Sequence, residues 1–152
     1  MEKIVQKMNL LWGGCVTLAT AILGDHWYLF VAFLLLNIVD YITGICKAKY
    51  FGLENSCEGL KGILKKLGYW VCIAIAFFVS VAFADMGKVI GYDLGFTQVF
   101  GWFTLATFII NEIRSILENL VLMDVEVPSF LVKGLEVAKK KIEERNVTDE
   151  DL

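Results

Sequence analysis

The chain alternates long apolar stretches with short segments that carry its lysines and arginines. Four stretches contain no Lys or Arg and are dominated by apolar residues: 8–24, 27–46, 67–84 and 94–111. Each approaches the roughly 20 residues that a helix needs to cross about 30 Å of hydrocarbon. The pattern therefore predicts an all-α, polytopic membrane protein with four transmembrane helices.

The positive charges between these stretches predict an orientation, because Lys- and Arg-rich loops stay on the cytoplasmic side. The segments before the first stretch, between the second and third, and after the fourth are rich in Lys and Arg, whereas the segments after the first and third hold none and one. This alternation predicts four crossings of the bacterial cytoplasmic membrane with both termini inside. An alternative interpretation of the first stretch is a secretory signal peptide with Lys3 and Lys7 as its basic region.

Composition supports a membrane protein and narrows the chemistry. Of the 152 residues, 57% are hydrophobic and 20% charged, against about 45–50% apolar residues in soluble domains. The four cysteines form no CxxC pair, His26 is the single histidine, and no catalytic or nucleotide-binding motif is present. We therefore predict no enzyme, no catalytic residue, no cofactor and no metal site. The basic segments are explained by topology, so they do not indicate nucleic-acid binding.

The segment between the second and third stretches has two faces. In 59–67, GLKGILKKL, apolar residues fall on one side of a helix and lysines on the other, which predicts an interfacial helix on anionic lipid. A plain cytoplasmic extension of the third span fits the same pattern. In both cases we expect the lysines of this region to face lipid headgroups: Lys47, Lys49, Lys61, Lys65 and Lys66.

A second amphipathic helix is predicted after Pro128, which breaks the preceding helix. Its apolar stripe is Leu131, Leu135, Ala138 and Ile142, basic residues surround it, and the chain ends in an acidic tail. We expect a transmembrane domain over 1–127 and a cytoplasmic helix with its tail over 128–152. The stripe suits either the membrane surface or packing against copies of the same chain.

Polar residues inside the predicted spans indicate contacts between helices. Asn37, Asp40 and Gly44 share one face of the second span, and a charge within a span calls for a partner or water. We expect Asp40 to face a polar group at the end of the fourth span, for assembly within or between subunits: Asn111, Glu112, Arg114, Ser115 and Glu118. Alternatively, Asp40 reaches the interface beside Lys47, and Arg114 pairs with Glu118 along its own helix.

Two pairs of segments then suggest a family. They are DYITGICKAKYFG at 40–52 with KGILKKLGY at 61–69, and NEIRSILENL at 111–120 with VPSFL at 127–131. In order and spacing they resemble the toxin-secretion and phage-lysis holin family. The resemblance implies a protein that oligomerises in the cytoplasmic membrane into pores or lesions, through which a cell-wall hydrolase (endolysin) or a large toxin leaves the cell.

Two other functions fit the same chain at this point. One is a small transporter or ion channel that uses Asp40 and Glu112 as coupling residues. The other is an antiholin-type regulator, which assembles without opening.

Overall fold

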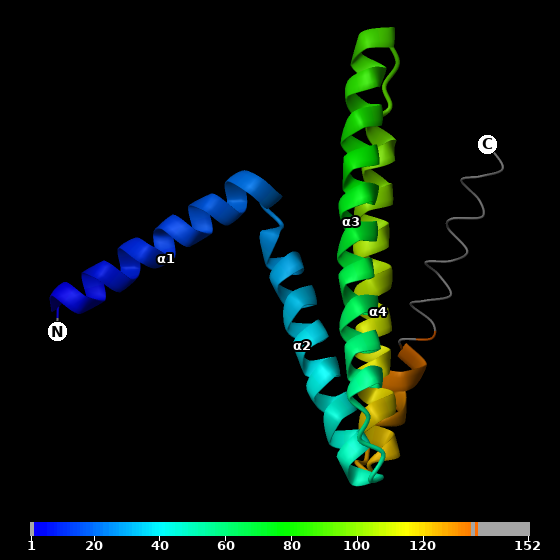
Figure 1. The fold of residues 1–152 in the computed structure, drawn as a ribbon. Helices are drawn as coiled ribbons and strands as arrows, with labels where there is room; N and C mark the ends of the chain where they lie inside the picture. Colours follow the sequence, from blue (N-terminus) through cyan, green and yellow to red (C-terminus); the bar gives the residue numbers. More distant parts are fainter. Residues whose placement is uncertain (1, 135, 137–152) are drawn as a thin grey trace. The chain divides into compact units, whose positions relative to one another are not determined.

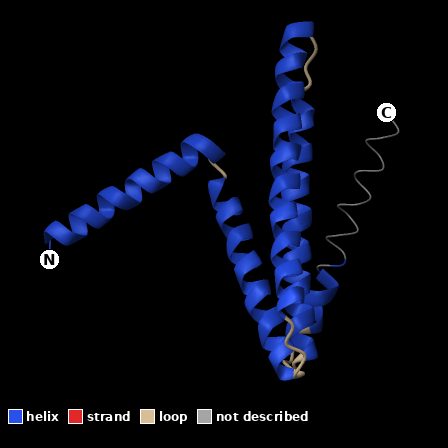
Figure 2. Cartoon of the chain, in the orientation of Figure 1, coloured by secondary structure: helices blue, strands red, loops and turns tan. Residues whose placement is uncertain are grey.

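The computed structural model describes residues 2–134 and 136. This part of the chain is helical, with turns and short loops between the helices (Figures 1 and 2). Its elements are α1 (Glu2–Leu23), α2 (Trp27–Tyr50), α3 (Ser56–Ile90), the 3-10 helix η1 (Gly95–Thr97) and α4 (Gln98–Leu122). The all-α prediction is confirmed for the described residues.

The chain forms two compact units, Met1–Leu34 and Leu35–Leu152. The first unit holds α1 and the beginning of α2. Gly24 ends α1 in the left-handed region, at φ 75°, with its N–H donating to the carbonyl of Thr20 at 2.9 Å. Glycine suits this position because it lacks the Cβ that makes positive φ unfavourable.

The second unit contains α3, which corrects one prediction. A separate interfacial helix between the second and third spans is wrong, because residues Ser56–Ile90 form one uninterrupted helix of 35 residues. Asn55 caps its start, where its Oδ1 accepts from the backbone N–H of Cys57 at 2.9 Å. No proline interrupts the segment, so the basic stretch continues directly into the apolar one. At 1.5 Å per residue α3 is about 52 Å long, well beyond the roughly 30 Å of hydrocarbon.

Helices α3 and α4 form a long antiparallel hairpin, visible side by side in Figure 1. One register holds from end to end, as four pairs of contacts show: Lys66 with Glu112, Tyr69 stacked on Phe108, Phe77 edge-on to Trp102, and Ser80 with Thr97. Ile73 and Leu105 are fully buried at the middle of the same seam. This register sets which residues of the two helices lie at the same level.

Helices α3 and α4 approach each other closely at Gly101, which has no side chain. A Cβ added there would lie 2.6–2.8 Å from three atoms of the Phe77 ring. The backbone N–H of Gly101 also donates to the Ser80 hydroxyl at 3.2 Å, and that hydroxyl donates to the carbonyl of Ala76 at 2.8 Å. A small residue on α4 therefore allows both the aromatic packing and this bridge between helices.

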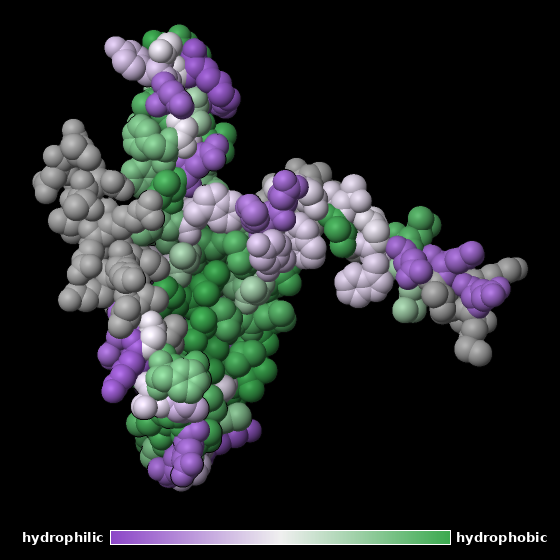
Figure 3. Space-filling view, turned by 180° about the vertical axis from the view of Figure 1, so that it is seen from behind, coloured by the Kyte–Doolittle hydropathy of each residue, from purple (hydrophilic) through white to green (hydrophobic). Residues whose placement is uncertain are grey.

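The outer surface of these helices is apolar. Within the described residues, α2 and α3 are long and apolar enough to span a membrane, with mean hydropathies of 2.1 and 2.2, and only a small share of each apolar segment is buried. Large side chains such as Val71, Ile75 and Phe78 are more than half exposed. In Figure 3 apolar residues gather along the middle of the visible face, with hydrophilic residues towards its ends. Such a surface calls for a lipid environment or a partner protein.

Helix α4 continues beyond Arg114 to Leu122, as the sequence predicted. The chain then leaves the helix, passes Pro128 and becomes helical again at residues 129–134 and 136. The rest of the predicted amphipathic helix lies outside the described residues, including Leu135, Ala138, Ile142, the basic face and the acidic tail.

Candidate functional site: an ion cluster joining three helices

Charged side chains from three helices meet at one point of the second unit. The ammonium of Lys66 on α3 donates to Oδ2 of Asp40 on α2 at 2.7 Å, and also to Oε2 of Glu112 on α4. We call these three residues the ion cluster. Because the lysine contacts both carboxylates, it links α2 and α4 through α3.

Burial makes the ion cluster energetically important. The side chains of Lys66, Asp40 and Glu112 are 14%, 15% and 3% exposed. Removing charges from water is costly unless opposite charges and hydrogen bonds offset the loss, so none of the three can be removed without leaving a poorly solvated partner. If both carboxylates are ionised, two negative charges face one positive charge.

Neutral polar groups extend the ion cluster towards the end of α4. The amide of Asn119, itself buried, donates to Oδ1 of Asp40 and to the hydroxyl of Thr43, both at 3.2 Å. The Thr43 hydroxyl donates to the backbone carbonyl of Asp40 at 3.0 Å. Gly44 lies next to Asn119, since a Cβ there would be 3.9 Å from its amide nitrogen. These contacts orient the Asp40 carboxylate between Lys66 and Asn119.

A further contact ties the same ends of α2 and α4 together. The hydroxyl of Tyr50, the last residue of α2, donates to the carboxylate of Asp124 at 2.7 Å. Asp124 follows α4 and has a positive φ of 60°. Both residues are exposed, so this bond contributes less than the buried ion cluster.

An open cavity of about 500 Å³ lies beside the ion cluster, between α3 and α4. It brings Asp40 together with the polar residues that the sequence placed at the end of the fourth span: Asn111, Glu112, Arg114, Ser115 and Glu118. Residues of α3 complete the lining: Gly62, Lys65, Lys66 and Tyr69. The ion partner of Asp40, however, is Lys66 rather than a residue of α4.

Arg114 lies at this cavity but pairs along its own helix. Its Nε donates to Oε1 of Glu118 at 2.7 Å, and the two side chains are 55% and 57% exposed. This i,i+4 pairing is the alternative that the spacing along the helix also allowed. An exposed pair of this kind contributes little to stability, so both groups remain available to other partners.

Comparison with known proteins assigns the chain to a family. The bacteriophage holin family matches residues 17–140, which is most of the chain. The chain belongs to the bacteriophage holin family. The match includes α2, α3, α4 and all residues of the ion cluster.

The chain is also similar to individual proteins, one of which is named a probable holin. An uncharacterised protein of Halalkalibacterium halodurans is 30% identical over 132 residues, covering 86% of this chain and 93% of the relative. An uncharacterised protein of Listeria innocua is 30% identical over 85% of this chain and 83% of its own length. A probable holin of Bacillus phage phi105 is 26% identical over 77% and 78%. No solved structure matches the chain at a significant level.

Membership of the holin family settles the broad class of the protein. Holins are membrane proteins rather than enzymes, so this chain is not an enzyme. Within the residues that the structure describes, no group of three or more His, Cys, Asp or Glu side chains could hold a metal ion.

The structure places the five predicted lipid-facing lysines in different environments. Lys49, Lys61 and Lys65 are exposed and Lys47 is partly exposed, and the Lys65 ammonium lies 5.8 Å from the centre of the Tyr69 ring. Lys66 corrects the prediction, because its ammonium lies in the ion cluster rather than at the surface. Two carboxylates from neighbouring helices outweigh the hydration that it would gain at the headgroups.

For two further residues of this site, the sequence carries a spacing signal. Asn119 lies two turns after Glu112, on the same face of α4 as Leu105, so its spacing indicates a buried position. Thr43 lies one turn after Asp40 on α2. The sequence gives no reason to prefer Lys66 to Lys65, because the two adjacent residues have the same charge. In the structure Lys66 lies in the ion cluster, whereas Lys65 is exposed. Asn37, on the predicted polar face of α2, is buried.

Proposed function

We propose that this holin-family chain crosses the bacterial cytoplasmic membrane four times, with both ends inside, and assembles with copies of itself into pores or lesions. The cargo is a cell-wall hydrolase or a large protein toxin that has no other route across the membrane. The match of the holin family to residues 17–140 carries this proposal. The probable holin among its relatives supports it.

Surface chemistry and helix pairing support crossings by α2, α3 and α4. The exposed apolar surfaces of α2 and α3 call for lipid, and the antiparallel pairing of α3 with α4 returns the chain to the side from which α3 began. The Lys and Arg distribution then sets the cytoplasmic side at the end that holds the ion cluster. Lys88, with its exposed partner Asp85, falls at the outer end of α3.

The ion cluster supports a role in holding the subunit together before assembly. It lies just below the apolar segments of α3 and α4, where a charge is costly in lipid unless it is paired. Lys66 satisfies the carboxylates of both neighbouring helices. A subunit in which Lys66 pairs with both carboxylates can accumulate in the membrane without exposing Asp40 or Glu112 to hydrocarbon.

The segment after Pro128 is proposed to act from the cytoplasmic side. We assign 1–127 to the membrane domain and 128–152 to a cytoplasmic helix and tail that do not form the pore wall. The basic residues at 139–141 would bind anionic lipid, each contributing on the order of 1 kcal/mol. The exposed lysines Lys49, Lys61 and Lys65 would add to the same attraction.

Expression in a bacterium, with and without a cytoplasmic wall hydrolase, tests the function. We expect abrupt growth arrest and entry of a membrane-impermeant dye in both strains, and lysis only where the hydrolase is present. A tolerated protein that carries one solute would instead indicate a transporter. A protein that only delays another holin would indicate an antiholin. Either of these results would overturn the proposal.

A further inference from the structure

Helix α4 carries two distinct faces along its length. One is buried against α3 and α2 and contains Gly101, Leu105, Glu112 and Asn119. The other is a line of polar side chains at alternating intervals of three and four residues: Thr104, Thr107, Asn111, Arg114 and Glu118. We call this second face the polar stripe. Intervals of three and four keep side chains on one side of a helix, in the pattern of a helix-pairing seam.

The hydrogen bonds of the polar stripe stay within α4. The hydroxyls of Thr104 and Thr107 donate to the carbonyls of Phe100 and Phe103, at 2.8 and 2.9 Å. Arg114 donates to Glu118, one turn further along. The stripe therefore borders the ion cluster, since Asn111, Arg114 and Glu118 also line the open cavity beside it.

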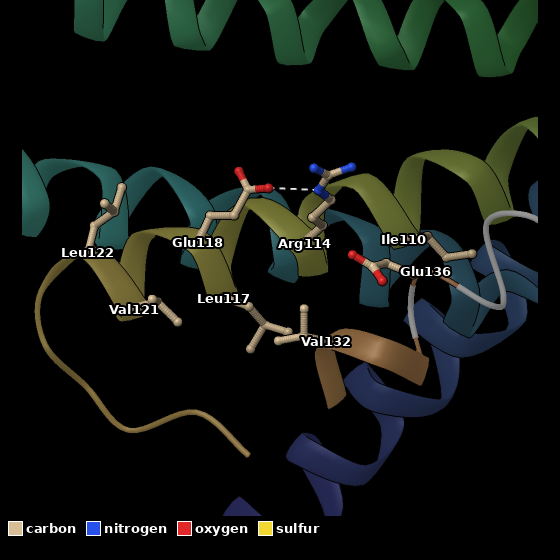
Figure 4. Close-up of a pocket in the computed structure, with 8 residues that line it drawn as sticks. All are labelled: Ile110, Arg114, Leu117, Glu118, Val121, Leu122, Val132 and Glu136. Carbon is tan, nitrogen blue, oxygen red and sulfur yellow. Dashed lines mark hydrogen bonds and ion pairs between the residues drawn. The ribbon is translucent and has the colours of Figure 1, made fainter. Parts of the chain in front are cut away.

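An apolar groove runs beside the polar stripe. Its volume is about 470 Å³, and α4 lines it with Ile110, Leu117, Val121 and Leu122. Val132, in the helical turn after Pro128, forms the opposite wall (Figure 4). Arg114, Glu118 and Glu136 also line the groove, so the polar stripe and the groove share an edge.

The side chains of the polar stripe and the groove indicate what binds there, a lipid or another protein. A lipid acyl chain would fill the groove but would bring hydrocarbon against the charged side chains of Arg114 and Glu118 that line it. Polar groups in that position favour a partner with hydrogen-bonding side chains. A second copy of α4 supplies both apolar residues for the groove and polar residues for the stripe.

The polar stripe is also complementary to itself. The Asn111 amide both donates and accepts, so it can pair with the same residue of another copy. Arg114 and Glu118 are more than half exposed and carry opposite charges. Arg114 of one subunit can therefore pair with Glu118 of a neighbouring subunit instead of with its own. We propose that two copies of this chain associate α4 against α4, through the polar stripe and the adjacent groove. This inference rests on the proposed assembly and names the surface that performs it.

Disulfide cross-linking in membranes tests the surface. The full-length chain is first made without its own cysteines, by the changes Cys15→Ser, Cys46→Ser, Cys57→Ser and Cys72→Ser. Single cysteines are then introduced by Thr107→Cys and Asn111→Cys on the polar stripe. Val71→Cys and Leu67→Cys are the matched controls, because the hairpin register puts them at similar levels on exposed positions of α3.

We expect copper-phenanthroline oxidation to give about tenfold more disulfide dimer at the two stripe positions than at the two controls, because a specific contact outweighs random collision. The difference should persist when the protein is diluted with added lipid. Equal cross-linking at stripe and control positions would overturn the proposal. So would the absence of dimer at both stripe positions.

Dye entry, measured on the same cells, separates this inference from the proposed function. If disulfide dimers form preferentially at the stripe positions but no dye enters the cells, the contact between α4 helices is supported and the proposed pore is contradicted. Dye entry with cross-linking that does not favour the stripe would support the pore and contradict the α4 contact.

Discussion

The ammonium of Lys66 lies 2.7 Å from the carboxylate of Asp40, although 26 residues and a change of helix direction separate the two along the chain. The same ammonium contacts Glu112, a further 46 residues on. One side chain therefore connects the three helices of the second unit. In the proposed topology, this position would let the subunit carry two carboxylates near the hydrocarbon boundary without facing them towards lipid.

Replacing Lys66 should destabilise the protein strongly. Lys66→Ala leaves the buried carboxylate of Glu112 and the partly buried carboxylate of Asp40 without their cation, and breaking a buried pair typically costs about 3–5 kcal/mol. Thermal unfolding of the protein in detergent or nanodiscs should show the loss. Lys65→Ala is the matched control, and it should change stability by about 0.5 kcal/mol or less, as exposed positions usually do.

Neutralising both carboxylates should rescue the lysine variant. We expect Lys66→Met combined with Asp40→Asn and Glu112→Gln to unfold at a higher temperature than Lys66→Met alone, because no buried charge then lacks a partner. If the triple variant were less stable than Lys66→Met, the ion cluster would not be held together by charge.

A second cation at position 40 should disturb the subunit more than loss of the carboxylate. Asp40→Lys places two ammonium groups side by side, whereas Asp40→Ala leaves Lys66 paired with Glu112. We expect both variants to insert into the membrane and to shift the time of dye entry, with the larger shift in Asp40→Lys. If both variants, at matched expression, let dye enter at the same time as the wild-type protein, Asp40 has no role in membrane permeabilisation.

Two glycines should respond in opposite directions to alanine. Gly101→Ala forces a Cβ against the Phe77 ring, and overpacking of this kind costs about 1–3 kcal/mol. Gly68→Ala meets no atom within 4 Å and should stabilise α3 by about 0.5–1 kcal/mol, because alanine is the better helix former. Unfolding of the two variants under one set of conditions provides the comparison. A stabilising Gly101→Ala would contradict the close contact between α3 and α4.

The proposed topology is tested by labelling single cysteines from outside the cell. In a background without the native cysteines, residues introduced at Gly24 and Gly91 should react with a membrane-impermeant maleimide. Those at Asn55 and Asn146 should react only after the cells are opened. External reaction at Asn55 or Asn146 would contradict four crossings with both ends inside.

Truncation at Ser129 tests the proposed role of the C-terminal segment. We expect the shortened protein to insert and to remain lethal, with a shifted time of dye entry, because 129–152 contains no segment long and apolar enough to span the membrane. Full-length protein at the same membrane concentration is the control. A truncated protein that inserts and never permeabilises the membrane would show that the segment belongs to the pore assembly.

The sequence by itself determined the helical, membrane character of this chain. That character follows from the length and apolarity of local stretches, which need no knowledge of the neighbouring helices. The sequence also grouped Asp40 with the polar residues of the fourth span, and Asp40 and Glu112 line one cavity. The pairing of Arg114 with Glu118 was within reach as well, because residues four apart on one helix are always neighbours.

Only the tertiary structure decided which lysine completes the ion cluster. Lys65 and Lys66 have the same charge and adjacent positions, but a helix turns them about 100° apart. The rotation of α3 against α4 is set by packing along the seam, through Tyr69 on Phe108 one turn from the charges and Phe77 on Gly101 farther along. That rotation turns Lys66 towards Asp40 and leaves Lys65 exposed. The choice depends on the fit of side chains between helices, which the order of residues along one helix does not reveal.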